Sequence, residues 1–168
     1  MGTLWNTYAF FVLYADIDKY NPSEYDLKKC KLSLMDKWVL SKLNTLIKTV
    51  DEGLDNYKIF ETARTIQDFT DELSNWYVRR GRERYWGSEM TDDKAAAYTT
   101  LYTVLVTLAK ICAPFVPFMT ESMYLNLVVP FFKDAPESVH LCDFPTADES
   151  LIDKKLEEGM ETVLEIVT

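Results

Sequence analysis

Apolar residues recur at three- and four-residue steps along most of the chain, which predicts a series of amphipathic helices. The clearest pattern follows Ser33, a suitable N-cap residue, with Asp36 placed to complement the first helical turn. This helix should run for about six turns and end near Tyr57. A helix at 3–17 is also predicted. Its buried face would consist of Trp5, Tyr8, Phe11, Val12 and Ala15.

Four further helices follow from the same periodicity. One spans 59–86, and the next begins after the N-cap residue Thr91. Pro117 suits the first turn of a fifth helix, and Ser150 is expected to cap the last one. Between these two helices, residues 138–144 alternate between apolar and polar side chains, which predicts a short extended segment.

Short connections between amphipathic helices predict antiparallel neighbours, so the fold class is all-α, an antiparallel helical bundle. The 168 residues fit one domain, which we expect to occupy residues 1–145. A trailing helix would occupy 146–168. Its apolar pattern reaches the last residue without a stop signal, so we expect it to lead into a missing C-terminal region.

The scarcity of some residue types excludes several kinds of active site. His140 is the only histidine, and it is interpreted as a packed, hydrogen-bonded residue. Cys30, Cys112 and Cys142 form no C-x-x-C pair, and Cys112 is expected in the core. No glycine pattern matches a phosphate-binding loop. We therefore expect no metal site, cofactor or catalytic residue in this chain. Scattered free thiols suggest a cytoplasmic protein.

The net charge of −9 argues against a nucleic-acid binder when the chain is taken as a whole. Residues 76–86 depart from this average, because four arginines and one glutamate give the segment a charge of +3. Arginine among aromatic residues is typical of RNA contact, since guanidinium groups bind phosphates and aromatic rings stack on bases. The other interpretation is a helix end whose arginines pair with Asp and Glu. We expect Trp76 and Tyr77 to pack in the core.

The outer face of the helix after Ser33 is a weaker candidate for a basic surface. Acidic residues follow it closely, which favours a solvated polar face. Its polar side chains are Lys37, Ser41, Lys42, Asn44 and Lys48.

Five blocks of sequence resemble class I isoleucyl-tRNA synthetases. Residues 33–44, SLMDKWVLSKLN, are similar to the family's D-x-W-I-L-S-x-L-N helix, and residues 73–80, LSNWYVRR, to its L-S-N-W-Y-V-R-R segment. Residues 6–15, NTYAFFVLYA, resemble the first helix of its anticodon-binding domain. Two further blocks, at 113–121 and 138–145, are shared with valyl and leucyl enzymes. The blocks at 6–15 and 73–80 favour isoleucine.

The resemblance implies a helical bundle that packs on the anticodon stem-loop of tRNA-Ile. The whole enzyme would join isoleucine to this tRNA with ATP and Mg. The HIGH and KMSKS signatures of the ATP site are absent here, so this piece should have no such activity. The other partners of this domain would be the catalytic and C-terminal domains of the same enzyme. No contact with a membrane is expected. The expected tRNA contacts are Arg79, Arg80, Arg82 and Arg84, with Lys42 and Asn44 as further contributors.

Two other interpretations stay open. The chain could be a helical protein-interaction or scaffolding module that does not bind RNA. It could also be the equivalent domain of a valyl- or leucyl-tRNA synthetase. A stand-alone enzyme is disfavoured, because no set of residues in the sequence forms a catalytic centre.

Overall fold

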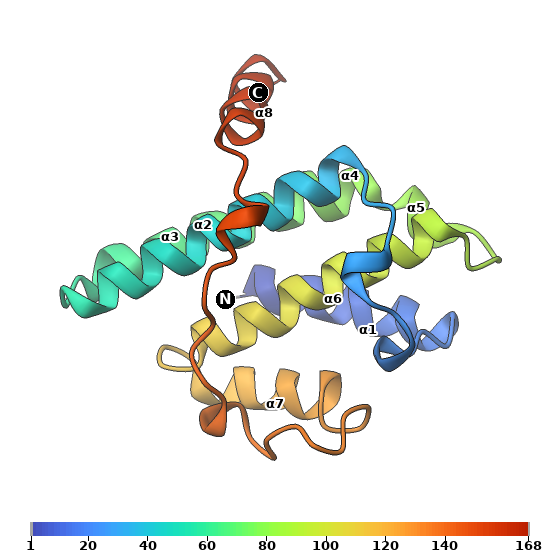
Figure 1. The fold of residues 1–168 in the computed structure, drawn as a ribbon, viewed down its shortest axis with the longest axis horizontal. Helices are drawn as coiled ribbons and strands as arrows, with labels where there is room; N and C mark the ends of the chain where they lie inside the picture. The colour runs from blue at the N-terminus through green and yellow to red at the C-terminus, as the bar shows by residue number, and fades with distance from the viewer. Residues whose placement is uncertain (1, 168) are drawn as a thin grey trace.

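A computed structural model describes residues 2–167 of the chain, and within this range it contains helices and turns but no strand. The predicted all-α bundle is confirmed. In Figure 1, α2 and α3 run side by side as a long hairpin, α1 and α6 lie beneath them, and α7 packs on α6. The long helices are α1 (Gly2–Ile17), α2 (Leu34–Asp55), α3 (Ile59–Glu72), α6 (Asp92–Cys112), α7 (Pro117–Leu127) and α8 (Lys154–Val167).

The start of α2 follows directly from its sequence. The Ser33 hydroxyl accepts from the backbone N–H of Asp36 at 3.2 Å, and the Asp36 carboxylate accepts from the backbone N–H of Ser33 at 2.8 Å. This reciprocal pair is a capping box, which satisfies two amide groups that the first turn leaves without helical partners. The predicted cap is therefore confirmed. It also places the Asp36 carboxylate at the helix end, where it gains further partners.

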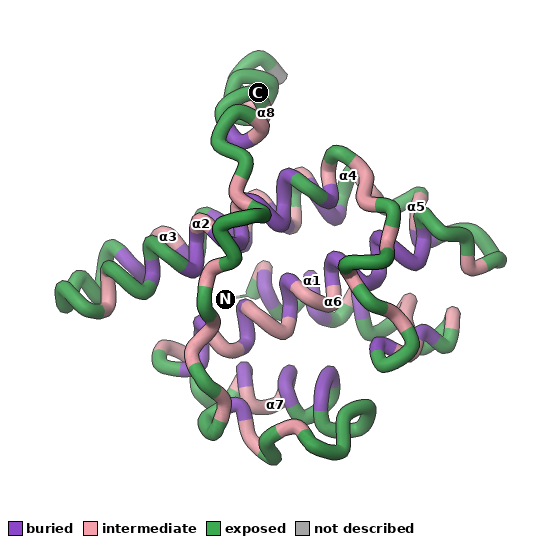
Figure 2. The backbone as a smooth tube through the Cα atoms, viewed as in Figure 1, coloured by how far each residue is buried: buried purple, intermediate pink, exposed green. Residues whose placement is uncertain are grey.

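Helix α6 forms the centre of the core. Its predicted N-cap is confirmed, because the Thr91 hydroxyl accepts from the backbone N–H of Lys94 at 3.2 Å. Asp92–Cys112 is long and apolar enough to cross a membrane, but 72% of its most apolar stretch is buried inside the bundle. Cys112 is buried as expected. Figure 2 shows buried residues along most of the length of α6, as in a core helix.

The buried face of α1 differs from the prediction. Trp5 and Val12, expected in the core, are 41% and 37% exposed. Apolar residues surround this helix, so their spacing does not select one face, and tertiary packing decides which side is covered. Leu13 and Ile17 also remain exposed. The residues that the core takes are Leu4, Thr7, Tyr8 and Phe11.

The expected extended segment at 138–144 is instead a 3₁₀ turn at Val139–Leu141. A β-strand is stabilised by hydrogen bonds to a neighbouring strand, and the described residues offer none. The segment is held by α7, since the Ser138 hydroxyl and the Val139 N–H both donate to Glu121. The turn buries Val139 and exposes His140, so the interpretation of His140 as a packed residue is wrong.

The last helix begins later than Ser150. The Asp148 carboxylate accepts from the Ser150 N–H at 3.0 Å and caps a 3₁₀ turn at Glu149–Leu151. Helix α8 then starts at Lys154, where the Asp153 carboxylate accepts from the N–H of Leu156 at 3.1 Å. The predicted Ser150 cap is therefore wrong, because two nearby aspartates provide the caps instead.

Candidate nucleic-acid interface

The predicted helix at 59–86 contains a widened turn immediately before the arginines. Residues Leu73–Val78 form a π-helical stretch, and the N–H of Arg79 donates to the carbonyl of Ser74, five residues earlier. Short helices α4 (Arg79–Gly81) and α5 (Glu83–Trp86) continue along the same path. One extra residue in a helical turn rotates everything that follows by about 100°, and such turns are frequent at functional sites. The stretch therefore sets which arginines face outward.

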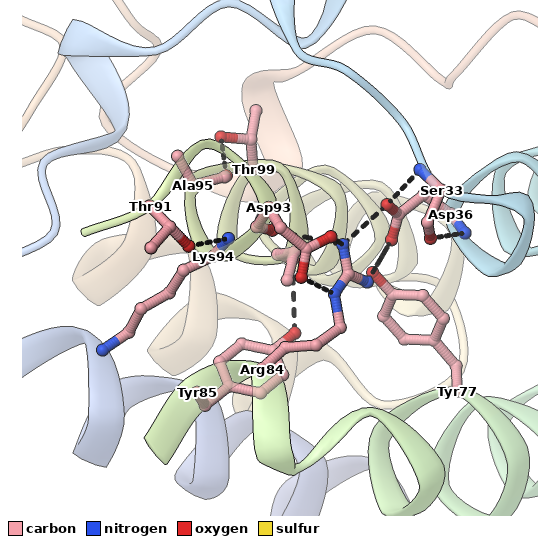
Figure 3. A network of polar contacts seen from close by, with 11 residues as sticks. Ser33, Asp36, Tyr77, Arg84, Tyr85, Thr91, Asp93, Lys94, Ala95 and Thr99 are labelled. Carbon is pink, nitrogen blue, oxygen red and sulfur yellow. Dashed lines mark hydrogen bonds and ion pairs between the residues drawn. The ribbon is translucent and has the colours of Figure 1, made fainter. Parts of the chain in front are cut away.

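Arg84 faces inward and forms a clamp between three segments (Figure 3). Its guanidinium makes a two-pronged contact with Asp36 at 2.7 and 2.9 Å. It also donates to the Asp93 carboxylate at 2.8 and 2.9 Å. Asp36 is fully buried and accepts a further hydrogen bond from the hydroxyl of Tyr77 at 2.6 Å. The clamp thus joins the start of α2, the arginine segment and the start of α6.

Electrostatics in the clamp favour the charged forms of both partners. Burial raises the pKa of Asp36, but hydrogen bonds from Arg84, Tyr77 and the Ser33 N–H outweigh it, so the pKa lies below its usual value. Burial lowers the pKa of Arg84, but its hydrogen bonds to Asp36 and Asp93 outweigh that effect and raise it. A guanidinium held by two carboxylates has few donors left for a phosphate. We assign Arg84 a structural role.

The other three arginines of the segment are exposed, and we call Arg79, Arg80 and Arg82 the arginine row. The guanidinium of Arg80 lies over the ring of Trp76, 4.4 Å from its centroid, in a cation–π contact. Trp76 packs on the core and Tyr77 is buried, as expected. Among the described side chains, no carboxylate forms an ion pair with the arginine row. With Arg84 already paired, the row and Glu83 leave a local charge of +2.

Asn44 is not available to a ligand, because it is buried under the C-terminal part of the chain. Its side-chain N–H donates to the carbonyl of Leu40 at 2.8 Å. Its side-chain oxygen accepts from the backbone N–H of Asp148 at 2.8 Å. Asn44 therefore holds the connector that precedes α8.

Lys42 is also engaged within the chain. Its side chain is largely buried and lies 3.0 Å from the carboxylate of Glu72 and 3.7 Å from that of Glu161 in α8. Two carboxylates on one ammonium group leave a phosphate little to gain. The polar face of α2 is therefore largely covered by the chain's own C-terminal segment and is not a solvated surface over its whole length.

The covering of α2 depends on Glu157, which no pattern in the sequence singles out. Its buried carboxylate accepts from the hydroxyls of Ser41 and Thr45 at 2.5 and 2.8 Å, and Lys154 lies at 3.2 Å. Burial raises the pKa of Glu157, but these three partners outweigh it and lower the pKa. The one available signal is the spacing of uncharged polar residues on α2 at Ser41, Asn44 and Thr45.

A second buried ion pair holds the far end of the arginine segment. Lys94 of α6 is 2% exposed, lies 2.7 Å from the carboxylate of Asp18, and donates to the carbonyl of Gly87 at 2.5 Å. The Tyr98 hydroxyl donates to Asp18 as well. The segment that carries the arginine row is thus held near Arg84 and again at Gly87. Its exposed side chains therefore extend from a fixed backbone.

In the part of the chain that the structure describes, no group of metal ligands accompanies the arginine row. Within residues 2–167, no three His, Cys, Asp or Glu side chains come together in a way that could hold a metal ion. What the site offers is three exposed guanidinium groups on a braced helical segment, which is suited to binding an anion along a surface.

Comparison with known proteins identifies similar chains. The profile of the family described as the anticodon-binding domain of tRNA ligase matches residues 36–168. The isoleucine–tRNA ligase of Clostridium novyi is 60% identical over 167 residues, covering 99% of this chain, and that of Clostridium acetobutylicum is 58% identical over the same length. The isoleucine–tRNA ligase of Dehalococcoides mccartyi is 52% identical over 163 residues. The chain spans about 16% of the length of these relatives.

Proposed function

Because the chain belongs to the family of anticodon-binding domains of tRNA ligases, we propose that it binds the anticodon stem-loop of tRNA-Ile. It would do so within an isoleucine–tRNA ligase and position the tRNA for ATP-dependent aminoacylation by a catalytic domain elsewhere in that enzyme. The observation that carries this proposal at the level of residues is the arginine row, exposed and without carboxylate partners in the described part of the chain.

The arginine row would bind the RNA backbone through its phosphates. Guanidinium groups donate two parallel hydrogen bonds to a phosphate and stay charged at any physiological pH. Bracing by Arg84 and Lys94 would reduce the entropy lost on binding, since the backbone of the segment is already ordered. The net charge of −9 over the whole chain would repel RNA from other surfaces and limit binding to the row.

ATP and Mg belong to the reaction of the whole ligase, and the described residues of this chain do not fit either of them. The described part of the chain holds no carboxylate cluster for Mg, and the sequence contains no phosphate-binding loop. In this proposal the chain contributes tRNA binding, and the chemical step belongs to the catalytic domain. We place it in the cytoplasm, where tRNA charging supplies the ribosome.

The catalytic and C-terminal domains of the same longer chain are the other partners in this proposal. Helix α1 presents Trp5, Leu13 and Ile17 to solvent, and exposed apolar side chains of this kind are candidates for contact with another domain. A cavity of about 560 Å³ lies beside it, between α1, α6 and the end of α7. We assign 1–145 to the tRNA-binding bundle and 146–168 to the connection toward the C-terminal region.

The test compares the salt dependence of RNA binding between variants. Replacing Arg79, Arg80 and Arg82 together by Ala should weaken binding of the tRNA-Ile anticodon stem-loop. It should also reduce the slope of log K against log salt by about 0.7–0.9 for each phosphate that the variant no longer binds. Arg64→Ala is the matched control, because Arg64 is an exposed arginine on α3, before the π-helical stretch. Equal slopes for the triple variant and the wild type would contradict the proposal.

A further inference from the structure

Trp86, the last residue of α5, is 60% exposed. Its indole N–H donates to the hydroxyl of Tyr14 in α1 at 3.2 Å, so one edge of the ring is fixed while much of its surface remains accessible. In Figure 1, α5 lies at the end of the bundle opposite the α2–α3 turn, away from α8. Tyr57, Phe60 and Phe118 are more exposed than Trp86, so what distinguishes Trp86 is its fixed edge and its place directly after the arginine row. Its position therefore suggests a ligand-binding role.

The helical path places Trp86 in line with two members of the arginine row. Val78, Arg79 and Arg82 all have right-handed helical backbone angles, and the N–H of Tyr85 donates to the carbonyl of Arg82 at 3.0 Å, so the chain keeps a helical path through the turn between α4 and α5. Positions 79, 82 and 86 follow the i, i+3, i+7 spacing of one helical face. The opposite face carries the inward side chains, with Arg84 in its clamp and Tyr85 buried. The exposed face thus holds two guanidinium groups and an indole ring, in that order.

This order of groups fits a single strand of RNA with one unpaired and unstacked base. Seven residues of helix span about 10 Å, which is enough for two successive phosphates. Two arginines can hold those phosphates, while an accessible indole offers a flat surface on which any unpaired base can stack. A double-stranded stem would use the arginines alone, because its bases stay stacked inside the helix.

We propose that Trp86 is a stacking surface for an unpaired nucleotide whose neighbouring phosphates are bound by Arg79 and Arg82. The inference rests on the proposed function and adds to it the kind of nucleotide that the segment takes. The fixed edge of the ring supports the inference, since a ring already oriented by Tyr14 loses little freedom when a base stacks on it.

The other partly exposed tryptophans lack this combination of features. Trp76 is only half-buried, but Arg80 already covers its ring. Trp5 is 41% exposed on α1, a helix without a single Lys or Arg. An apolar protein partner would suit Trp5, whereas the adjacent positive charge at Trp86 favours RNA. Trp5 is therefore the matched control for Trp86.

The experiment uses two RNA probes and three tryptophan variants. One probe is the tRNA-Ile anticodon stem-loop with 2-aminopurine in the loop, and the other is the stem alone as a blunt duplex. Trp86→Ala should lower affinity for the stem-loop about 5- to 150-fold, the range for losing one base stack, and leave duplex affinity unchanged. Trp86→Phe should retain most of the affinity, and Trp5→Ala should behave as the wild type.

The salt slope separates this proposal from the one on which it rests. Trp86→Ala should keep the wild-type slope, since the arginines still bind the same phosphates. Equal stem-loop affinity for Trp86→Ala and wild type would overturn the stacking role. So would an equal loss on the duplex, which would mean that the ring only supports the arginine row. Wild-type chain that binds neither probe in a salt-dependent way would instead overturn the proposed function.

A second measurement uses the wild-type chain alone, so the proposal can be tested even if a tryptophan variant fails to fold. Stacking on Trp86 should quench the 2-aminopurine fluorescence, and ultraviolet irradiation should cross-link Trp86 to a loop nucleotide, which mass spectrometry of the peptides identifies. A cross-link at Trp5 or Trp76, with none at Trp86, would overturn the proposal.

Discussion

Two candidate basic regions of the molecule differ in whether their predicted contact residues are available to a partner. The polar face of α2 holds Lys42 and Asn44, and the chain's own segment from 146 onward covers both. The segment after the π-helical stretch holds the arginine row, whose side chains remain exposed. A basic residue in the sequence is therefore a candidate for binding RNA only if its side chain forms no ion pair with a carboxylate in the fold.

The same contrast exists within the arginine segment itself. Arg80 and Arg84 are four residues apart and line one small hollow beside Ser33 and Tyr77. Arg84 reaches two carboxylates, whereas Arg80 reaches only the ring of Trp76. One arginine thus braces the fold, while the other has no carboxylate partner among the described side chains. Substitutions at these two positions should separate the two roles.

The largest effect is expected for Arg84→Ala. Removing the guanidinium leaves the fully buried carboxylate of Asp36 without its cation, and breaking a buried pair in this way costs about 3–5 kcal/mol. The value should lie near the lower end, about 3 kcal/mol, because the Arg84 side chain is 18% exposed and water can partly replace it. Urea unfolding measures the change in the free energy of unfolding. Arg84→Lys should restore little, since an ammonium group cannot make the two-pronged contact.

Acid should weaken the same clamp. The pKa of Asp36 is lower in the folded chain than its usual value, so its contribution to stability is complete above about pH 4, the usual pKa of an aspartate. That contribution is lost as the pH falls through the folded-state pKa. Arg84→Ala should flatten this part of the stability–pH curve. An unchanged acid dependence in Arg84→Ala would contradict the assignment of the clamp.

A smaller and more local effect is expected at the covered face of α2. Glu157→Ala leaves the hydroxyls of Ser41 and Thr45 without their shared acceptor, and should cost about 1–3 kcal/mol. Loss of these bonds should loosen α8 from α2 and leave the apolar core intact, because no residue of the apolar core contributes to them. Hydrogen exchange of the α8 amides measures the change. Glu158→Ala is the matched control, since Glu158 is exposed beside it on the same helix. Equal exchange in both variants would argue against this anchor.

Local sequence signals predicted most of the fold, because helix ends depend on residues close together in the chain. The caps at Ser33 and Thr91 and the proline at the start of α7 all lie where the sequence placed them. At Ser150 the same logic failed, since neighbouring Asp148 and Asp153 compete for the same role.

The candidate site was harder to predict, because its contacts join distant parts of the chain. Arg84 and Asp36 are 48 residues apart, and Asn44 and Asp148 are 104 apart. Composition revealed that the segment at 76–86 was unusually basic, but not which arginine would be paired. The π-helical stretch adds a further rotation that a regular 3.6-residue period does not anticipate. Charge could therefore be located from the sequence, while its availability depended on tertiary packing.

The smallest effect on stability is expected for Arg80→Ala, which completes the comparison with Arg84. Its cation–π contact with Trp76 is worth about 0.5–1 kcal/mol at an exposed site. The free energy of unfolding measured in urea should therefore fall by no more than this amount. RNA affinity should nevertheless fall, because the guanidinium is free to bind a phosphate. Arg80→Lys keeps the charge and should retain most of the salt slope. A stability loss at Arg80 as large as that at Arg84 would mean that both arginines brace the fold, leaving Arg79 and Arg82 as the binding pair.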